Sequence, residues 1–275
     1  MVTNITAQEN ADIFKFAVGS FEVITLSEGQ QKSGSSILID ATSEMIDKYA
    51  PDGTFPSACN AFLLKTPDKT ILIDAGFGRN LFENLKSQNV TAEEVDIVLL
   101  THMHGDHIGG LLHNGKIAFP NAQLYIAQLE HDYWMNIDSR RGEQAQNVIK
   151  AYKDKFQLFA PVDLQNSTNE LLSGISAIAA YGHTPGHTAY LLKSENSQFL
   201  IWGDLTHAMA IQMPHPEIAV TYDVNPEDAV MARKKILEYV AKNRIPVAGM
   251  HIAFPAMGNV TEGANGGYKF TAIKN

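Results

Sequence analysis

The chain has 275 residues, 45% of them hydrophobic, and a formal net charge of −9, which suits one large core and predicts a single domain over residues 1–275. The acidic balance without a basic stripe argues against a nucleic-acid partner, and the nearest cationic run, Arg233 to Lys235, is predicted to be the solvated face of a helix. The sequence contains no run of 18 apolar residues, so we expect no helix that spans a membrane and no membrane partner. The expected partner is a small-molecule substrate.

Residues 1–12 are polar, and we expect them to be loosely ordered. They lack the basic start and apolar core of a signal peptide. The one cysteine, Cys59, cannot form an internal disulfide, so nothing marks an oxidising compartment. We therefore expect a cytoplasmic chain, or a periplasmic or secreted one whose signal peptide has been removed.

The first half of the chain is predicted to be rich in strands. Apolar runs and turn residues predict strands at 14–18, 21–26, 61–65, 70–74, 95–100 and 123–127. Helices are predicted at 81–88 and in parts of 129–155, and Thr91 with Glu94 has the spacing of a capping box. Residues 27–58 contain Gly, Ser and Pro, and we expect a long irregular arm with a short helix at 43–49.

The most informative stretch is residues 95–110, VDIVLLTHMHGDHIGG, in which a buried strand leads into a polar loop. Four metal-capable side chains follow within six residues, and these are His102, His104, Asp106 and His107. In extended chain the first two point to the same side, and Gly105 lets the chain turn back toward that side. Because histidine with carboxylate is the usual ligand set of catalytic zinc, the loop predicts two ligand clusters for two metal ions.

The second half repeats this pattern at separate strand ends. Strands are predicted at 175–181, 189–192, 198–203 and 245–250, with a terminal strand near 268–270. Three of them lead to a metal-capable side chain, and these are His183, Asp204 and His251. Asn225 is predicted to cap a helix that has Pro226 at its first position. Ligands at four strand ends indicate one site assembled from different strands.

Together these motifs resemble the ligand set of the binuclear branch of the metallo-β-lactamase-fold hydrolases. The resemblance implies an α/β fold of four layers, an αβ/βα sandwich in which two mixed β-sheets are flanked by helices. It implies one metal held by His102, His104 and His183, and a second held by Asp106, His107 and His251, with Asp204 bridging them. Two zinc ions suit these ligand types, which also accept iron, manganese or cobalt.

Departures from some relatives narrow the function. Zinc β-lactamases of the commonest type carry Cys at the position of Asp204, and flavodiiron proteins carry Glu at that of His104, so both activities are disfavoured. The C-terminal part of glyoxalase II and the extra domain of RNA-processing relatives have no counterpart here. The strings GHTPGHT and GDLTHAMAIQ instead resemble methyl parathion hydrolase and the N-acyl homoserine lactone lactonases.

This resemblance implies that a hydroxide shared by two metals attacks a carbonyl carbon or a phosphorus. Asp204 would fix the metal separation, and Asp106 would bind metal and relay a proton. His207 stands three residues after Asp204, where some lactonases place a Tyr that holds the substrate carbonyl, so it is a candidate catalytic residue, with a merely packed histidine as the alternative.

The leading functional hypothesis is a binuclear hydrolase of lactones or esters, a quorum-quenching lactonase of N-acyl homoserine lactones being one candidate. An organophosphate triesterase like methyl parathion hydrolase is the second hypothesis. A non-catalytic, metal-stabilised binding protein is an alternative of another class. Relatives in this branch also imply a homodimer.

Residues around the ligands are predicted to support them. Asp74 and His187 are candidates to hydrogen-bond the metal ligands, with a turn-forming role as the alternative for Asp74. We expect pocket walls from residues 27–58, 129–160 and 205–224. Their candidate apolar side chains are Phe55, Phe77, Trp134, Met209 and Phe254, whereas His113, His131 and His215 are expected to lie outside the site.

Overall fold

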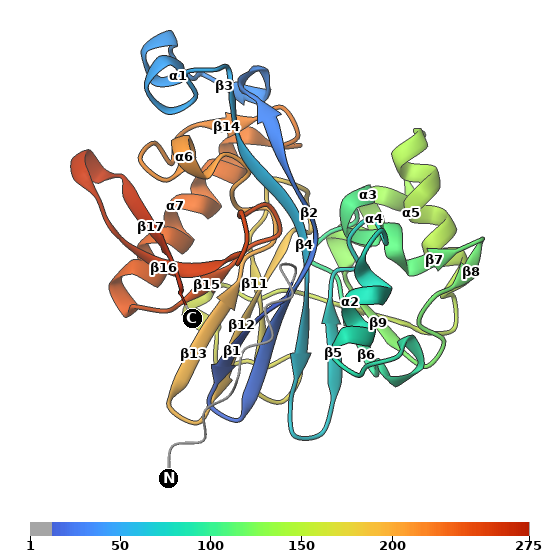
Figure 1. The fold of residues 1–275 in the computed structure, drawn as a ribbon. Coiled ribbons are helices and arrows are strands. Elements are labelled where there is room, and N and C mark those ends of the chain that lie inside the picture. The colour runs from blue at the N-terminus through green and yellow to red at the C-terminus, as the bar shows by residue number, and fades with distance from the viewer. Residues whose placement is uncertain (1–12, 275) are drawn as a thin grey trace.

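The computed structural model describes residues 13–274, and most of its strands form two large sheets (Figure 1). The first sheet has the order β1 (Ile13–Val18), β2 (Phe21–Gly34), β4 (Thr54–Lys65), β5 (Thr70–Ile73), β6 (Ile97–Leu99), β9 (Gln123–Ala127) and β10 (Phe156–Phe159). Strands β1, β2, β4 and β5 pair antiparallel, whereas β5, β6, β9 and β10 pair parallel. The sheet is therefore mixed, as predicted.

The second sheet has the order β11 (Ile175–Ala179), β12 (Thr188–Ser194), β13 (Ser197–Ile201), β15 (Val247–Ala248), β16 (Met257–Glu262) and β17 (Tyr268–Ala272). Only the β13–β15 pairing is parallel, so this sheet is also mixed. Two short ribbons complete the strands. They pair β3 (Leu38–Ile39) with β14 (Ala219–Val220), and β7 (Leu112–His113) with β8 (Lys116–Ile117).

Helices cover the outer faces of the two sheets (Figure 1). The α-helices are α1 (Ser43–Tyr49), α2 (Leu81–Ser87), α3 (Gly105–Ile108), α4 (Gln128–Met135), α5 (Arg140–Ala151), α6 (Met209–Gln212) and α7 (Pro226–Asn243). In Figure 1, α2, α4 and α5 lie on the side of the first sheet, and α7 lies on the side of the second. The predicted fold class, two mixed sheets flanked by helices, is confirmed.

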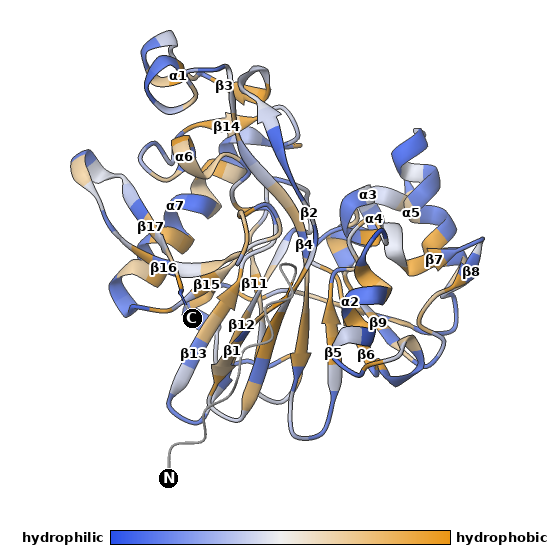
Figure 2. Cartoon of the chain, viewed as in Figure 1, coloured by the Kyte–Doolittle hydropathy of each residue, from blue (hydrophilic) through white to orange (hydrophobic). Residues whose placement is uncertain are grey.

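Strand β4 shows why these layers form. Its successive side chains point to opposite faces of the sheet. Phe62 and Leu64 are buried in the same core as Tyr190 of the second sheet, whereas Leu63 is buried with Leu85 of α2 in the core beneath the helices. Because both faces of the strand are covered, its sequence is almost continuously apolar. Figure 2 shows the same concentration of hydrophobic residues in the central strands.

The prediction of an irregular arm over residues 27–58 was partly wrong. Strands β2 and β4 continue pairing far beyond their apolar segments, from Glu22–Lys65 to Gly34–Thr54. Backbone hydrogen bonds to the partner strand hold this ribbon, so alternation of apolar residues is not needed to form it. The predicted helix at 43–49 is confirmed as α1. The arm packs through Phe55 against Ile211 and Ile218 in a small separate core.

The remaining predictions for helices and strands were mostly confirmed. Asn225 accepts a hydrogen bond from the backbone N–H of Asp228 at 3.2 Å, and Pro226 begins α7. The Thr91 capping box is present, but it begins a single 3₁₀ turn. Strands β10 and β16 were not predicted. The prediction of loose order for residues 1–12 falls outside the described part of the chain.

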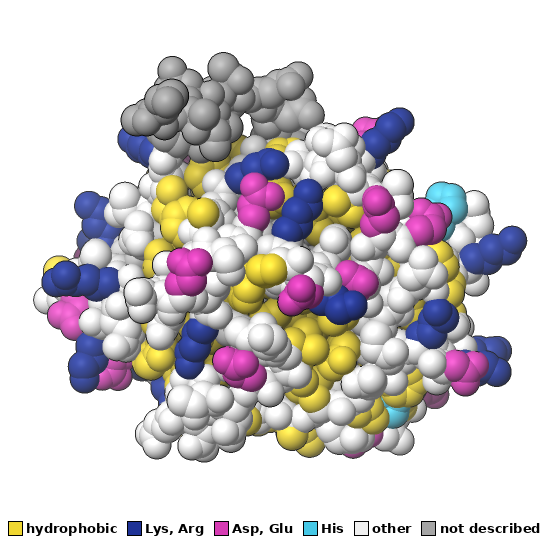
Figure 3. Space-filling view, turned by 90° about the horizontal axis from the view of Figure 1, so that it is seen from below, with side chains coloured by type: hydrophobic (Ala, Val, Ile, Leu, Met, Phe, Trp, Pro, Cys, Tyr) yellow, Lys and Arg dark blue, Asp and Glu magenta, His cyan; other side chains and the backbone are white. Residues whose placement is uncertain are grey.

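Among residues 13–274, no helix is both long enough and apolar enough to cross a bilayer. On the face seen in Figure 3, Lys and Arg side chains alternate with Asp and Glu, and no continuous basic area appears there.

Candidate metal centre

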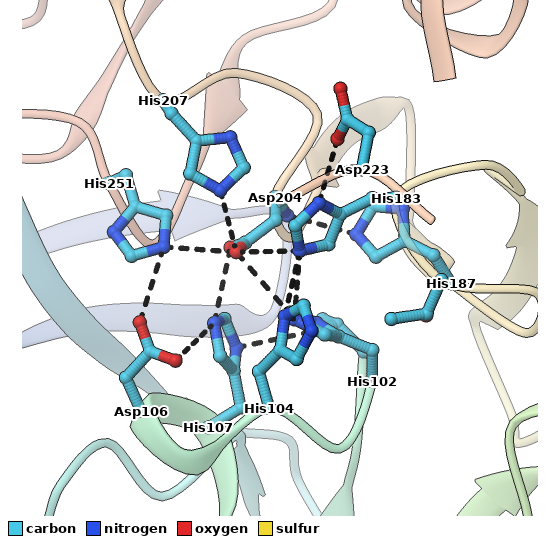
Figure 4. Close-up of polar contacts among 12 residues, drawn as sticks. His102, His104, Asp106, His107, His183, His187, Asp204, His207, Asp223 and His251 are labelled. Atoms are coloured by element: carbon cyan, nitrogen blue, oxygen red, sulfur yellow. Dashed lines mark hydrogen bonds and ion pairs between the residues drawn. The ribbon is translucent and has the colours of Figure 1, made fainter. Parts of the chain in front are cut away.

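The structure brings all seven predicted ligands together at one edge of the two sheets (Figure 4). They follow the ends of strands β6, β11, β13 and β15. The side chains are His102, His104, Asp106, His107, His183, Asp204 and His251. Together with His207 they form three metal-capable groups, in each of which the ligand atoms lie within 4.8 Å of one another, and His207 shares its group with Asp204 and His251. The expected assembly of one site from several strand ends is therefore observed.

Three imidazoles form the first group. His102 Nε2 lies 2.9 Å from His104 Nδ1, and His183 Nε2 lies 3.2 Å from the former and 3.0 Å from the latter. Ligand nitrogens on a tetrahedral zinc with bonds of about 2.0–2.1 Å would be about 3.3 Å apart. The three nitrogens thus have nearly the spacing that a shared cation requires.

Asp204 lies between this group and the second one. Its Oδ2 is 3.3 Å from His183 Nε2 and 3.0 Å from His251 Nε2, while its Oδ1 is 3.2 Å from His107 Nε2. The imidazoles around Asp204 hold the pKa of its carboxyl well below the usual range, although burial alone would raise that pKa. An ionised carboxylate that contacts histidines of both groups is suited to bridging two cations.

Asp106 completes the second group. Its Oδ2 is 3.5 Å from His251 Nε2, and its Oδ1 is 3.8 Å from His107 Nε2. Unlike the histidines, this carboxylate is partly exposed. Asp106 is therefore the ligand candidate of this group that is most accessible from the open side of the centre.

Unpartnered atoms indicate that a metal fits this site. His107 Nε2 and Asp204 Oδ1 are buried in the centre without a hydrogen-bond partner, which would be costly unless something else satisfies them. On the outer side, His107 Nδ1 lies 2.6 Å from Asp74 Oδ2, and His251 Nδ1 donates to Ala58 O at 2.8 Å. With Nδ1 as the donor, each of these rings keeps an Nε2 lone pair directed at the centre.

The two predicted supporting residues contact the centre. Asp74 is fully buried and accepts hydrogen bonds from the Thr101 backbone N–H and hydroxyl as well as from His107. His187 donates from Nδ1 to Ala180 O and accepts the backbone N–H of Asp204 at Nε2. Burial lowers the pKa of His187 to about 3, so the ring stays neutral and keeps both roles.

The sequence analysis missed Glu130, which ties two ligand loops together. This fully buried carboxylate on α4 accepts hydrogen bonds from the backbone N–H groups of Met103 and Gly186, and from the side chains of Trp134 and Thr184. Met103 lies between two ligands of the first loop, and Thr184 follows His183. No sequence signal identifies Glu130, because its position on α4 is compatible with an exposed charge.

A second missed support lies behind His183. The Asp223 carboxylate lies 2.9 Å from His183 Nδ1 and accepts the backbone N–H of Val220 at 3.0 Å. Arg233 donates to the carbonyls of Leu205 and Ile218, and its guanidinium lies 4.0 Å from Asp223. The prediction that Arg233 belongs to a solvated face was wrong, because the residue is only 1% exposed. Its hydrogen bonds to Leu205 and Ile218 hold the segment that follows Asp204 and the segment that precedes Asp223.

His207 is buried beside Asp204, with its Nε2 3.1 Å from Asp204 Oδ2. The Gln212 amide oxygen accepts the backbone N–H groups of His207 and Ala208, which holds the ring in place. Burial lowers the pKa of His207 to about 4, so a neutral imidazole is expected near pH 7. Its Nδ1 has no partner, and the ring lines the pocket above the centre.

A pocket of about 350 Å³ opens onto the ligands and is bordered by the three predicted wall segments. Of the five candidate apolar wall residues, only Phe77 lines it. The other four predictions were wrong because those side chains pack into cores. Phe55 is buried in the small core beneath the arm, and Trp134 donates a hydrogen bond to Glu130. Met209 and Phe254 pack against the main core.

Gly105 begins α3 with helical backbone. A Cβ there would lie 2.8 Å from Oε1 at the flexible end of the Gln144 side chain, so the Gln144 amide on α5 lies directly over this residue of the ligand loop. His113, His131 and His215 lie outside the metal-capable groups, as expected.

The family model for the metallo-beta-lactamase superfamily matches residues 54–244. The chain therefore belongs to this superfamily. The match includes six of the seven predicted ligands, and only His251 lies beyond it.

Two solved structures resemble the whole chain. A hydrolase of the β-lactamase superfamily named AbOPH has a TM-score of 0.87 and 27% identity, over 98% of this chain and 99% of that one. The dizinc quorum-quenching lactonase AidC, in complex with an N-acyl-L-homoserine product, has a TM-score of 0.86 and 25% identity, over 96% and 98%. The predicted enzyme class, a hydrolase of this superfamily, agrees with both.

Curated relatives match over shorter segments. The uncharacterised protein YobT of Bacillus subtilis is 28% identical over 138 residues, which are 48% of this chain and 56% of YobT. The anti-Pycsar protein Apyc1 of a Paenibacillus species is 36% identical over 107 residues, which are 36% of this chain and 41% of Apyc1. The chain thus spans about half the length of these relatives or less.

Proposed function

We propose that this protein is a binuclear metal-dependent hydrolase that opens lactones or cleaves esters, with N-acyl homoserine lactones as candidate substrates. One observation carries the proposal. Asp204 lies between the two histidine groups and borders an open pocket, with its Oδ2 near His183 of the first group and His251 of the second, and its Oδ1 near His107 of the second. AidC, which shares the fold over nearly its whole length, is described as a dizinc lactonase, and this supports zinc and a lactone substrate.

Two divalent ions held by these ligands would supply Lewis acidity and lower the pKa of a bound water toward about 7. The residues of the chain do the positioning. Asp204 sets the separation of the two groups, while Asp74 and Asp223 orient His107 and His183. The neutral His207 ring lines the pocket and is the proposed catalytic residue outside the seven predicted ligands. It has a single N–H, so to donate a hydrogen bond to a substrate carbonyl it would carry that hydrogen on Nδ1, which has no partner, and not on Nε2 beside Asp204.

The open pocket argues against a purely structural metal site. Structural zinc sites are closed by four protein ligands, whereas catalytic ones keep a position open. Here His104, Asp106 and His251 all line the pocket, so the ligand groups face the space available to a substrate. A metal held only to stabilise the fold would not need this access.

Proton release from lactones tests the proposal. The zinc- or cobalt-loaded protein is assayed with short- and long-chain N-acyl homoserine lactones, with a simple ester, and with a phosphotriester. Fast lactone opening with slow phosphotriester cleavage is the expected result. The reverse order would replace the lactonase by an organophosphate hydrolase.

The matched control is His104→Ala, which removes a first-group ligand that is also at the pocket surface. It should retain the circular dichroism spectrum and lose turnover. Full turnover in this variant, or no turnover of any substrate by the loaded wild-type protein, would refute the proposed hydrolase.

A further inference from the structure

The pocket wall formed by α5 differs in chemistry from the metal centre below it. Arg141 and Gln144 are three residues apart on this helix, so their side chains share one face, and both line the pocket. Gln144 lies over Gly105, between ligands His104 and Asp106 in the sequence. This wall therefore presents a guanidinium and an amide beside the position where a substrate would react.

Arg141 is available for a ligand. Within residues 13–274, the lysines and arginines that form ion pairs are Lys15, Lys69, Arg233 and Lys235. Arg141 is the one Lys or Arg that lines the pocket. The only carboxylates there are Asp106 and Asp204, and both belong to the ligand groups. Although the protein has a net charge of −9, the pocket therefore contains a guanidinium, that of Arg141, which forms no ion pair among the described residues.

The wall contributed by β2 and β4 is also polar. Gln31, Ser33 and Ser57 line the pocket from these strands, whereas Ile37, Phe77 and Tyr222 are the apolar side chains on its border. The three polar side chains offer hydrogen-bond donors and acceptors along this wall. A substrate with a hydrogen-bonding group away from its reacting carbonyl would match them.

We propose that Arg141, together with Gln144, forms a subsite for a carboxylate on the non-reacting part of the substrate. The preferred substrates are then lactones or esters that carry a second, anionic carboxylate group. The planar guanidinium can donate two parallel hydrogen bonds to a carboxylate, and the Gln144 amide can donate another. This inference rests on the proposed hydrolase function, and within it favours anionic lactones or esters over the neutral N-acyl homoserine lactones.

Paired substrates test the subsite. The 4-nitrophenyl monoester of glutarate carries the second carboxylate, and 4-nitrophenyl butyrate is its neutral counterpart. In the wild-type protein we expect a higher kcat/KM for the anionic ester. Arg141→Gln should lower kcat/KM for the anionic ester about tenfold, mainly through KM, because a charge-assisted bond is lost. The same variant should change the neutral ester by less than about twofold.

Arg140→Gln is the matched control. It removes the same charge from the neighbouring position of α5, which does not line the pocket. This variant should retain the preference of the wild-type protein. An equal preference in wild type and Arg141→Gln, or an equal loss in both variants, would overturn the subsite.

A binding measurement separates failure of the subsite from failure of the hydrolase. Calorimetry with the zinc-loaded protein compares glutarate with butyrate, since either can place one carboxylate at the metals but only glutarate has a second for Arg141. Tighter glutarate binding that disappears in Arg141→Gln supports the subsite even without turnover. Equal affinities in the wild type would overturn it.

Discussion

The two sheets contribute to the metal centre in different ways. The first sheet supplies four of the proposed ligands from one loop of six residues after β6. The second sheet supplies three, and each of them, His183, Asp204 and His251, follows a different strand. One half of the site is therefore local in the sequence, and the other half exists only when three strand ends meet.

The supports differ in the same way. Asp74, which directly follows β5, the strand paired with β6, holds His107. Each second-sheet ligand depends on a different segment: Asp223 holds His183, His187 holds the Asp204 backbone, and the carbonyl of Ala58 holds His251. Glu130 joins the two halves. The ligands that do not share one sequence motif, His183, Asp204 and His251, are thus each held by a different buried group.

The largest effect is expected for Asp204→Ala, because this residue belongs to both halves. Without its two oxygens neither metal keeps its full ligand set, so we expect loss of bound metal and a fall in turnover of at least about 10³-fold. Metal content measured by mass spectrometry, together with circular dichroism, checks this. Two tightly bound metals in the variant would show that Asp204 is not the bridge.

Glu130→Gln should be the next most damaging change. One acceptor oxygen becomes an NH₂ group that faces existing donors, so at least one buried hydrogen bond is lost and the free energy of unfolding should fall by about 2–3 kcal/mol. Chemical denaturation measures this. Glu143→Gln, an exposed position on α5, is the control and should be nearly neutral. Equal stability of the two variants would contradict the proposed tie between the loops.

The supports of the two halves can be compared directly through Asp74→Asn and Asp223→Asn. Each removes a carboxylate behind one ligand histidine, and we expect a 10–100-fold loss in affinity for the metal on that side. Competition with a chelator measures both affinities. Loss of the same metal in the two variants would contradict the assignment of His107 and His183 to separate groups.

The smallest effect is expected for Asn225→Ala at the start of α7. Losing the cap should lower the free energy of unfolding by about 1 kcal/mol. Because α7 carries Arg233 but no ligand, metal content should not change. A drop in metal content as large as that of Asp223→Asn would mean that the helix end, and not the carboxylate, positions the second-sheet ligand.

Much of the fold and the convergence of the ligands could be predicted from local patterns. Periodic apolar residues indicate strands, and metal-capable side chains at their ends indicate a shared site. The long β2–β4 ribbon was missed because its outer part is held by pairing, without apolar alternation. The pocket walls were predicted as segments, yet four of their five apolar candidates pack elsewhere.

The sequence by itself determined the ligand types, the strand ends that carry them and the superfamily they resemble, because these depend on spacing along the chain. Only the tertiary structure decided that Glu130, Asp223 and Arg233 are buried supports and that Arg141 faces the pocket. A charged side chain on a helix can be solvated or buried with equal local sequence. Which of the two occurs depends on the partners that distant segments bring to it.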